Sequence, residues 1–291
     1  MIPLDDIAAL AARIQAAQDG VHQLPMLTSE RSDFDLPSGY AVAEHLVQAR
    51  RRSGAVTLGR KIGFTNAALW PVYAVHQPIW GWMYDRTVTH IGSAPASVLA
   101  SALAPALAPA SAPATCSLAR FAEPKIEPEI VLHFHSAPPP GADVAGVLAC
   151  IDWVANGFEI VQSHFAGWRF AAADTVADGG LHGCLLIGQP VPVAALGADP
   201  AAALASFSLS LSCDGVQRDQ GTGANVLGSP LAAVAHLIQV LAGQPHAQPI
   251  QAGELITTGT ITMAHGIRSG ECWSTQLQGI DLPGLQVQFV D

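Results

Sequence analysis

The sequence predicts an α+β fold, with a mainly β roll or sandwich as its core and a helical subdomain at its N-terminus. Helical periodicity is concentrated early in the chain, where apolar residues recur every three to four positions over 4–19 and 40–52. From residue 115 onward, short alternating segments are separated by turn residues. Strands and helices do not alternate regularly there, and G-x-G-x-x-G and G-x-S-x-G motifs are absent, so dinucleotide-binding and α/β-hydrolase patterns are excluded.

The first part of the chain, 1–92, is expected to be an α/β subdomain. Its second helix begins after Ser38-Gly39 and ends at Gly54. The segment 57–66 is typical of a short strand interrupted by glycines, and a turn then leads into a helix over 67–75. Lys61 lies inside this strand, and the chain has only one other lysine, Lys125. Lys61 is either an edge-strand lysine that blocks aggregation or a charge directed into a pocket.

Two less regular segments follow this strand. Residues 78–85 are aromatic and rich in turn residues, and 93–114 is a low-complexity Ala/Pro/Ser stretch that we expect to be an exposed excursion without a catalytic role. The β-rich core is therefore expected to span 115–291.

The stretch 124–135 is the most informative part of this core. It alternates, so that Glu127 and Glu129 lie on one face of a strand, about 6–7 Å apart along the backbone. Apolar residues flank them in a chain of which only 12% is charged. Burying two like charges without a partner is unfavourable, and a hard divalent cation with oxygen ligands removes that conflict. The alternative is a solvated strand edge that carries two surface glutamates.

Other carboxylates in the core lie in comparable settings. Glu159 is flanked by Phe158 and Ile160 in a predicted strand over 150–163, and is either a third ligand or a buried glutamate paired with an arginine. The segment 164–180 is expected to be an irregular loop that carries Asp174 and Asp178, and such loops often bind ligands. The remaining predicted elements are a short helix at 143–148, strands at 181–188, 206–213 and 253–262, a hairpin turn at 214–215, a helix at 231–241 and β structure at 270–272 and 276–290.

Composition limits the possible partners and the compartment. The 291 residues carry a net charge of −10, which argues against nucleic acid. Five scattered cysteines without a C-x-x-C pair are typical of buried thiols in a reducing cytoplasm. The N-terminus lacks the basic region of a signal peptide, and prolines interrupt the most apolar stretch, 94–114, so no membrane segment is expected.

Seven short motifs, taken in order, resemble those of one protein family. They are Lys61-Ile-Gly-Phe-Thr65, Pro78-x-x-Gly81, Pro124-Lys-Ile-Glu-Pro-Glu129, Phe158-Glu-Ile-Val161, Asp174-Thr-Val-Ala-Asp178, Gly228-Ser-Pro-Leu231 and Thr258-Gly-Thr260. From about residue 40 to the end, the chain resembles the 2-keto-4-pentenoate hydratase / 4-oxalocrotonate decarboxylase group of the fumarylacetoacetate hydrolase superfamily. The resemblance implies a β-roll core, a cytoplasmic homo-oligomer and a Mg²⁺ or Mn²⁺ ion.

The same resemblance implies roles for individual residues. Glu127, Glu129 and Glu159 match the metal ligands, and Lys61 matches the active-site lysine. The segments that line the substrate pocket are matched by Thr65, Asp174, Thr258, Gly259 and Thr260. Three positions depart from the family pattern: Ile79 replaces an aspartate, Gln162-Ser163-His164 replaces Asp-Ser-Arg, and Asp178-Gly-Gly-Leu181 replaces Asp-Asn-Ala-Ser.

The implied reaction is hydration of a 2-hydroxy-2,4-dienoate to a 4-hydroxy-2-oxo acid. A 2-keto or 2-enol carboxylate would chelate the ion, Lys61 would act through a lowered pKa or as a fixed charge, and Asp178 or His164 would assist the water. The alternatives are decarboxylation of a 2-oxo-dioate, C–C hydrolysis of an acylpyruvate, or a metal-binding relative without activity. Alternation also places His133 and His135 on the face of Glu129, so a zinc site is a further alternative. Their position near the end of the strand favours a structural role for both histidines.

Overall fold

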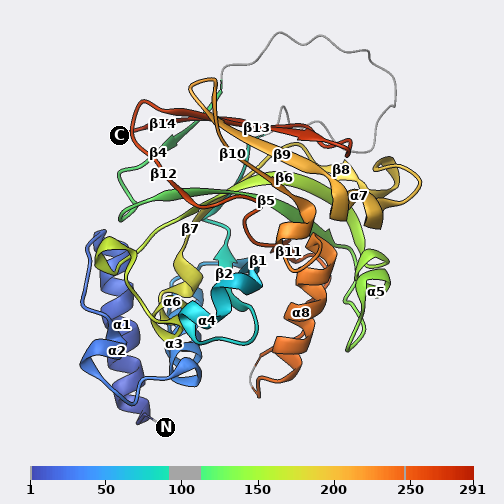
Figure 1. Cartoon of the computed structure of the whole chain (residues 1–291). Coiled ribbons are helices and arrows are strands. Elements are labelled where there is room, and N and C mark those ends of the chain that lie inside the picture. Colours follow the sequence, from blue (N-terminus) through green and yellow to red (C-terminus); the bar gives the residue numbers. More distant parts are fainter. Residues whose placement is uncertain (1, 92–112, 246) are drawn as a thin grey trace.

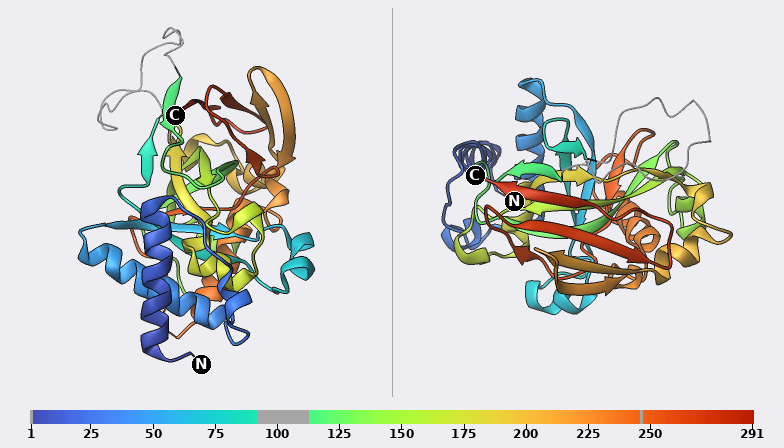
Figure 2. Two further views of the ribbon diagram at one scale, coloured as in Figure 1. Left: turned by 90° about the vertical axis from the view of Figure 1, so that its left-hand side faces the viewer. Right: turned by 90° about the horizontal axis from the view of Figure 1, so that it is seen from above.

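The structure, a computed structural model, describes residues 2–91, 113–245 and 247–291. Within these residues the strands form a larger sheet of order β2-β1-β11-β5-β6-β7-β3, with β12 beside β5 and β8 beside β6, and a five-stranded sheet of order β10-β9-β13-β14-β4. The smaller sheet lies over the larger one, and most helices lie on the opposite side (Figures 1 and 2). The predicted α+β fold with a β-rich core is confirmed.

The N-terminal helices are α1 (Leu4–Gly20), α2 (Leu27–Glu30) and α3 (Leu36–Arg52). The third begins four residues earlier than predicted, because the Asp35 side chain accepts a hydrogen bond from the Ser38 N–H and caps the helix. The apolar faces of α1 and α3 form a core cluster of their own with Phe165 and Ala173. The N-terminal helices are thereby packed against the chain segment that follows β6.

Strand β1 (Thr57–Gly63) pairs with β2 (Ile79–Tyr84) on one side and with β11 (Leu255–Thr257) on the other. Lys61 is therefore in an interior strand, and the edge-strand interpretation is wrong. The segment expected to be turn-rich is instead the strand β2, in which a Cβ at Gly81 would lie 2.2 Å from the Gly179 carbonyl oxygen. After β1 come η1 (Ala67–Leu69) and α4 (Trp70–Tyr73), where a helix was predicted, and then β3 (Val88–His90).

The predicted division into 1–92, 93–114 and 115–291 stays a prediction. Strands from both sides of it share the larger sheet, because β1 pairs with β11 and β3 pairs with β7. Most of the predicted excursion, 93–112, lies outside the described residues, which resume just before β4 (Ala114–Ser117).

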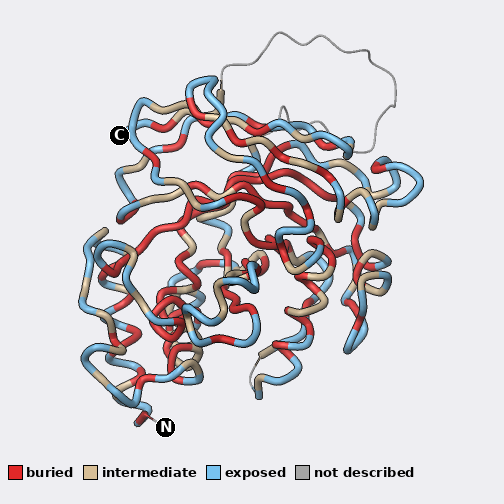
Figure 3. The backbone as a smooth tube through the Cα atoms, in the orientation of Figure 1, coloured by how far each residue is buried: buried red, intermediate tan, exposed pale blue. Residues whose placement is uncertain are grey.

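The centre of the larger sheet is formed by β5 (Lys125–Phe134), β6 (Ile151–Val161) and β7 (His182–Ile187), and the short helix α5 (Val144–Leu148) connects the first two. These strands are buried over most of their length (Figure 3). They pair in antiparallel register, with Glu127 opposite Glu159 and Glu129 opposite Gly157. The predicted glutamate strand is confirmed to within one residue at each end.

The segment after β6 is more regular than expected. It contains the helix α6 (Ala172–Ala177) between the 3₁₀ turns η2 (Ala166–Trp168) and η3 (Gly179–Leu181). The predicted strand over 253–262 is instead short, ending at Thr257, because Gly259 adopts a positive φ of 93° that a strand cannot continue through.

The second sheet contains β9 (Ser208–Cys213), β10 (Val216–Thr222), β13 (Cys272–Gln278) and β14 (Gln286–Val290). Its inner leucines, Leu209 and Leu211, pack in the main core with Ile130 and Phe158 of the larger sheet. The other elements are β8 (Val191–Pro192), η4 (Val193–Ala195), α7 (Pro200–Ser206), η5 (Gly223–Asn225), α8 (Pro230–Ala242) and β12 (His265–Gly266). Among the described residues, only 223–242 is long and apolar enough to span a membrane, and α8, which forms most of it, packs in the core.

Candidate metal centre and substrate cavity

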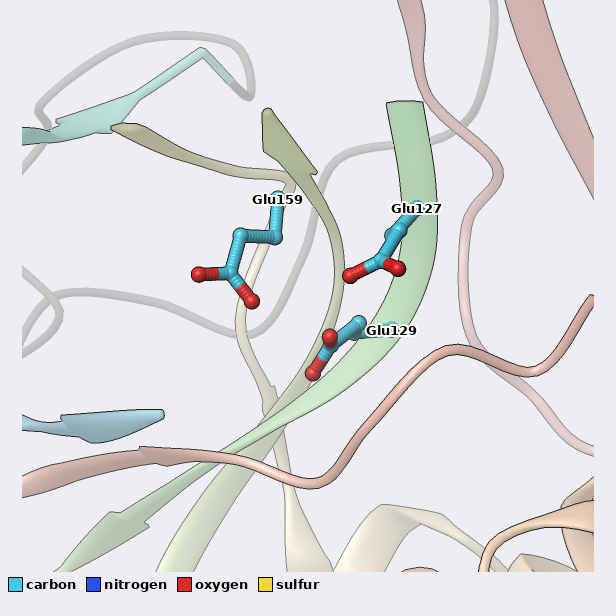
Figure 4. A group of neighbouring side chains, drawn as sticks. All are labelled: Glu127, Glu129 and Glu159. Carbon is cyan, nitrogen blue, oxygen red and sulfur yellow. The ribbon is translucent and has the colours of Figure 1, made fainter. Parts of the chain in front are cut away.

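Three glutamates from two neighbouring strands meet at the sheet centre. Glu127 and Glu129 extend from the same face of β5, and Glu159 extends from β6 beside them (Figure 4). One carboxylate oxygen of each lies within 4.8 Å of the others. Glu129 and Glu159 are fully buried, while Glu127 is partly exposed and lines a cavity. The structure thus brings together the three residues that the sequence selected as ligands.

Hydrogen bonding in this cluster leaves two buried carboxylate oxygens without a donor. Glu129 Oε2 accepts a 2.7 Å hydrogen bond from the Gly259 N–H, whereas Glu129 Oε1 accepts none. Glu159 Oε2 lies 3.1 Å from the Lys61 ammonium, yet it accepts no well-aligned hydrogen bond. A buried acceptor without a donor is costly, and a cation would compensate it. Carboxylate oxygens are ligands that suit hard ions such as Mg²⁺ and Mn²⁺, so the residues fit the predicted group.

The clustered charges shift the pKa values of all four groups. Burial raises the pKa of Glu127 to about 7 and holds that of Glu129 well above its usual value. Burial acts in the same direction on Glu159, but Lys61 and His182 outweigh it and lower that pKa to about 2. For Lys61, burial is outweighed by the three carboxylates, which raise its pKa to about 12. The lowered pKa considered for this lysine is not found, and it is a fixed positive charge here.

One neighbour of the cluster was not selected from the sequence. His182, at the start of β7, places Nδ1 2.8 Å from Glu159 Oε1 and Nε2 2.8 Å from the Thr87 hydroxyl oxygen. A carboxylate can only accept, so Nδ1 carries the proton of this hydrogen bond. The side chain therefore fixes the Glu159 carboxylate from the side opposite Lys61. Only the tertiary pairing of β6 with β7 places it there, and no local motif around residue 182 indicates it.

The cluster opens into a cavity of about 370 Å³. Lys61 and Glu127 lie in its wall, as do the predicted substrate residues Thr65, Gly259 and Thr260. Ile79, which replaces an aspartate of the family pattern, also lines it. Sequence reasoning did not assign several other lining residues, which are Phe64, Tyr73, Lys125, Trp168, Phe170, Asp219 and Asn225.

The ligands Glu129 and Glu159 lie behind the cavity wall, and four residues predicted to act in catalysis or to bind substrate do not line the cavity either. Asp174 accepts hydrogen bonds from the Thr28 N–H and hydroxyl and from the Ala171 N–H, and so ties α2 to α6. The Thr258 hydroxyl donates to the Ile130 carbonyl oxygen. His164 and Asp178 form a buried pair at 2.9 Å, which Gln18 of α1 completes with a hydrogen bond to the aspartate. These contacts account for the burial of Asp174, Thr258 and Asp178, whereas the buried His164 Nε2 has no hydrogen-bond partner among the described residues.

The two histidines of the zinc alternative are engaged elsewhere. His133 contacts Asp152 through Nδ1 and stacks on the Trp153 ring at 5.0 Å, and His135 lies 3.2 Å from the Ala149 carbonyl oxygen. Neither belongs to the acidic cluster found within the described ranges. The geometry therefore favours the three glutamates over a histidine site.

Comparisons with known proteins agree with this architecture. The chain is 28% identical over 276 residues to a 2-hydroxyhexa-2,4-dienoate hydratase of Comamonas testosteroni, covering 94% of each chain. It is 28% identical over 280 residues to a 4-oxalocrotonate decarboxylase of Pseudomonas sp. (strain CF600), covering 95% of this chain and 94% of the relative.

A solved structure has the same fold over the whole chain. It is the 4-oxalocrotonate decarboxylase from Pseudomonas putida G7, complexed with magnesium and adipate, with a TM-score of 0.86 and 24% identity over 100% of this chain and 99% of that one. The family profile described as "Fumarylacetoacetate (FAA) hydrolase C-terminal" matches residues 85–283, more than half of the sequence. The chain therefore belongs to the fumarylacetoacetate hydrolase family, within which it is similar to the hydratases and decarboxylases of 2-oxo and 2-hydroxydienoic acids.

Proposed function

We propose that this protein is a divalent-metal-dependent hydratase that adds water to a 2-hydroxy-2,4-dienoate and yields a 4-hydroxy-2-oxo acid. The observation that carries the proposal is the glutamate cluster, with two oxygens left without donors, at the base of a cavity that also contains Lys61. The similarity to a dienoate hydratase over most of both chains supports the same activity.

Glu127, Glu129 and Glu159 would hold a Mg²⁺ or Mn²⁺ ion. When bound, such an ion acts as a Lewis acid toward the carboxylate and the C2 oxygen of a 2-oxo or 2-hydroxy acid. Lys61 lines the cavity and stands beside Glu159 with a Nζ–Oε2 distance of 3.1 Å. As a fixed positive charge it would stabilise the negative charge that develops on an enolate.

The remaining residues bind substrate or direct water in this proposal. Thr65, Gly259 and Thr260 contact the substrate from the cavity wall. Asp178 and His164 would direct water as a pair, since Gly180 and Leu181, two and three residues after Asp178, line the cavity. Asp174 and Thr258 act indirectly, by holding α6 and the loop after β11 in place.

The test is a spectrophotometric assay of the purified protein with 2-hydroxypenta-2,4-dienoate and Mg²⁺, with and without EDTA. We expect loss of the dienol absorbance that depends on metal, with 4-hydroxy-2-oxopentanoate as product. Glu129→Gln removes one ionised ligand and is expected to lower Mg²⁺ affinity and turnover together, each by at least about tenfold. Full activity of this variant would show that the ligand assignment is wrong.

A second candidate reaction shares the same centre. Lys125 lines the cavity and has no ion-pair partner among the described residues, so a second carboxylate on the substrate would find a cation there. Decarboxylation of a 2-oxo-dioate, or C–C hydrolysis of an acylpyruvate, would then replace hydration. Metal-dependent release of CO₂ from 2-oxohex-3-enedioate, without turnover of the pentadienoate, would select decarboxylation. Metal binding without turnover of any of these acids would indicate a non-catalytic relative.

We also propose a cytoplasmic homo-oligomer. All five cysteines are free thiols, as expected in a reducing compartment. Size-exclusion chromatography with light scattering would measure the assembly, and a mass of about 30 kDa would contradict it.

A further inference from the structure

We propose, on the basis of the hydratase function above, that the far end of the substrate is an uncharged planar apolar group, such as an aryl or conjugated alkenyl substituent. This group would stack on an aromatic wall of the cavity. The proposal excludes both a bare five-carbon dienoate and a dicarboxylate as the preferred substrate.

The aromatic wall consists of four side chains in succession. Phe64 stacks on Tyr73 with ring centres 4.6 Å apart, and Tyr73 stacks on Phe170 at 5.9 Å. Trp168 meets the edge of Phe170 at 6.1 Å. All four line the cavity and are only partly buried. Partly exposed aromatic faces gathered in a cavity are typical of a surface that a planar apolar ligand covers.

Backbone strain at this wall indicates that its geometry is specifically held. Phe64 and Trp168 have positive φ angles of 55° and 58°, a conformation that is unfavourable for a residue with a side chain. Met263, 64% exposed, adds further apolar surface at the cavity wall. The chain thus holds two aromatic side chains in a strained backbone conformation and leaves apolar area exposed that a bound ligand would cover.

Among the described lining residues, only Lys125 could attract a second carboxylate, and the other charged and aromatic groups of the wall disfavour one. Lys125 and Lys61 are the cationic groups among the described lining residues; the first lies 3.9 Å over the Trp168 ring and the second is paired with Glu159. Aromatic faces carry negative electrostatic potential, which repels a carboxylate. Asp219, in the same wall, is held as an acceptor by the Met263 N–H and His265 Nε2, both at 3.0 Å, and adds a negative charge. An uncharged group meets none of this repulsion.

The size of the cavity agrees with an extended substrate. The volume of about 370 Å³ lies within the range of about 300–1,000 Å³ that small-molecule sites span. A substrate longer than a five-carbon dienoate is therefore compatible with the cavity.

The experiment separates binding of the far end from turnover. Calorimetry of the Mg²⁺-loaded protein would compare three ligands that cannot be hydrated: 2-oxopentanoate, 2-oxo-5-phenylpentanoate and 2-oxohexanedioate. We expect the phenyl compound to bind at least about tenfold more tightly than the other two. Phe170→Ala should abolish this preference, whereas Phe170→Leu, the control that keeps apolar volume, should retain part of it. In parallel, the dienol assay would compare 2-hydroxy-5-phenylpenta-2,4-dienoate with the unsubstituted dienoate.

The outcomes are distinct. Equal binding of the three ligands, or tightest binding of the dicarboxylate with loss of that affinity in Lys125→Gln, would overturn the inference even if hydration occurs. Phenyl preference without turnover of either dienoate would refute the hydratase function, and with it the assignment of a dienoate substrate. Phenyl preference in both binding and kcat/KM, lost in Phe170→Ala, would establish the inference.

Discussion

Replacing His182 by alanine should weaken metal binding although this side chain is not a ligand. In the wild-type protein its Nδ1 donates to Glu159 Oε1 at 2.8 Å, while Lys61 faces the other oxygen at 3.1 Å. Without His182, the Glu159 carboxylate loses its only well-formed hydrogen bond among the described residues and can rotate away from Glu127 and Glu129. Because the three carboxylates must converge to bind an ion, disorder of one lowers the affinity of the set.

The magnitude follows from the type of contact. A hydrogen bond to a charged group contributes about 1.5–3 kcal/mol, and losing a residue that orients a metal ligand typically costs about 10–100-fold in affinity. Since about 1.4 kcal/mol corresponds to a factor of ten, the two estimates agree. We therefore expect the Kd for Mg²⁺ or Mn²⁺ to rise about 10–100-fold in His182→Ala.

The assay is titration calorimetry of the metal-free protein with each ion. His182→Asn should recover part of the loss, because its amide N–H can reach the position of Nδ1. His133→Ala is the matched control, since His133 contacts Asp152 on the same sheet and outside the cluster. A Kd within about twofold of wild type in His182→Ala, with the protein folded by circular dichroism, would refute the orienting role.

Three further predictions concern strain, stability and pH. Gly180→Ala should lower turnover at least about tenfold, because its Cβ would lie 2.9 Å from Lys61 Cδ; Gly141→Ala, at nearly the same φ of +71° but with open space around it, should cost stability alone. Asp174→Ala removes the acceptor of three hydrogen bonds and should lower the free energy of unfolding by about 2–4 kcal/mol, measured by urea titration. An unchanged urea midpoint would contradict a stabilising role of Asp174. In EDTA, the free energy of unfolding should fall as pH rises from about 4.5 to 7. The reason is that Glu127 has a pKa of about 7 in the folded protein, whereas the unfolded chain releases this proton near 4.5. Saturating Mg²⁺ should remove this loss, and a metal-free protein that is equally stable at pH 5 and pH 7.5 would contradict the prediction.

Local patterns predicted the strand that carries the site. Alternation fixes which residues of 124–135 share a face, and burial of that strand follows from its apolar flanks, so β5 and the pairing of Glu127 with Glu129 on one face could be predicted. Glu159 could be selected for the same reason. Its position directly opposite Glu127 depends on the antiparallel register of β5 and β6, which periodicity alone does not determine.

Features that depend on distant pairing could not be predicted in this way. Lys61 lies in an interior strand only because β1 pairs with β11, nearly two hundred residues later. The helix α6 was expected to be a loop. It is short, and its Asp174 accepts a hydrogen bond from Thr28, a contact far away in sequence that local patterns do not indicate. The aromatic wall likewise combines residues from two segments about one hundred positions apart.

The positive charge of Lys61 is insufficient to compensate the negative charge of the three glutamates. Three ionised carboxylates and Lys61 sum to a charge of −2, and the described residues supply no second buried lysine or arginine at the cluster. His182 donates a hydrogen bond and need not be charged to do so. Without an ion the cluster reduces its charge by taking up protons, as the raised pKa values of Glu127 and Glu129 show. A divalent ion balances the same charge while leaving the carboxylates ionised, whereas a monovalent ion leaves an excess of −1. The sheet therefore holds an arrangement that is unfavourable when empty at neutral pH, and this is the physical reason to expect that a divalent ion, rather than Na⁺ or K⁺, stabilises the protein.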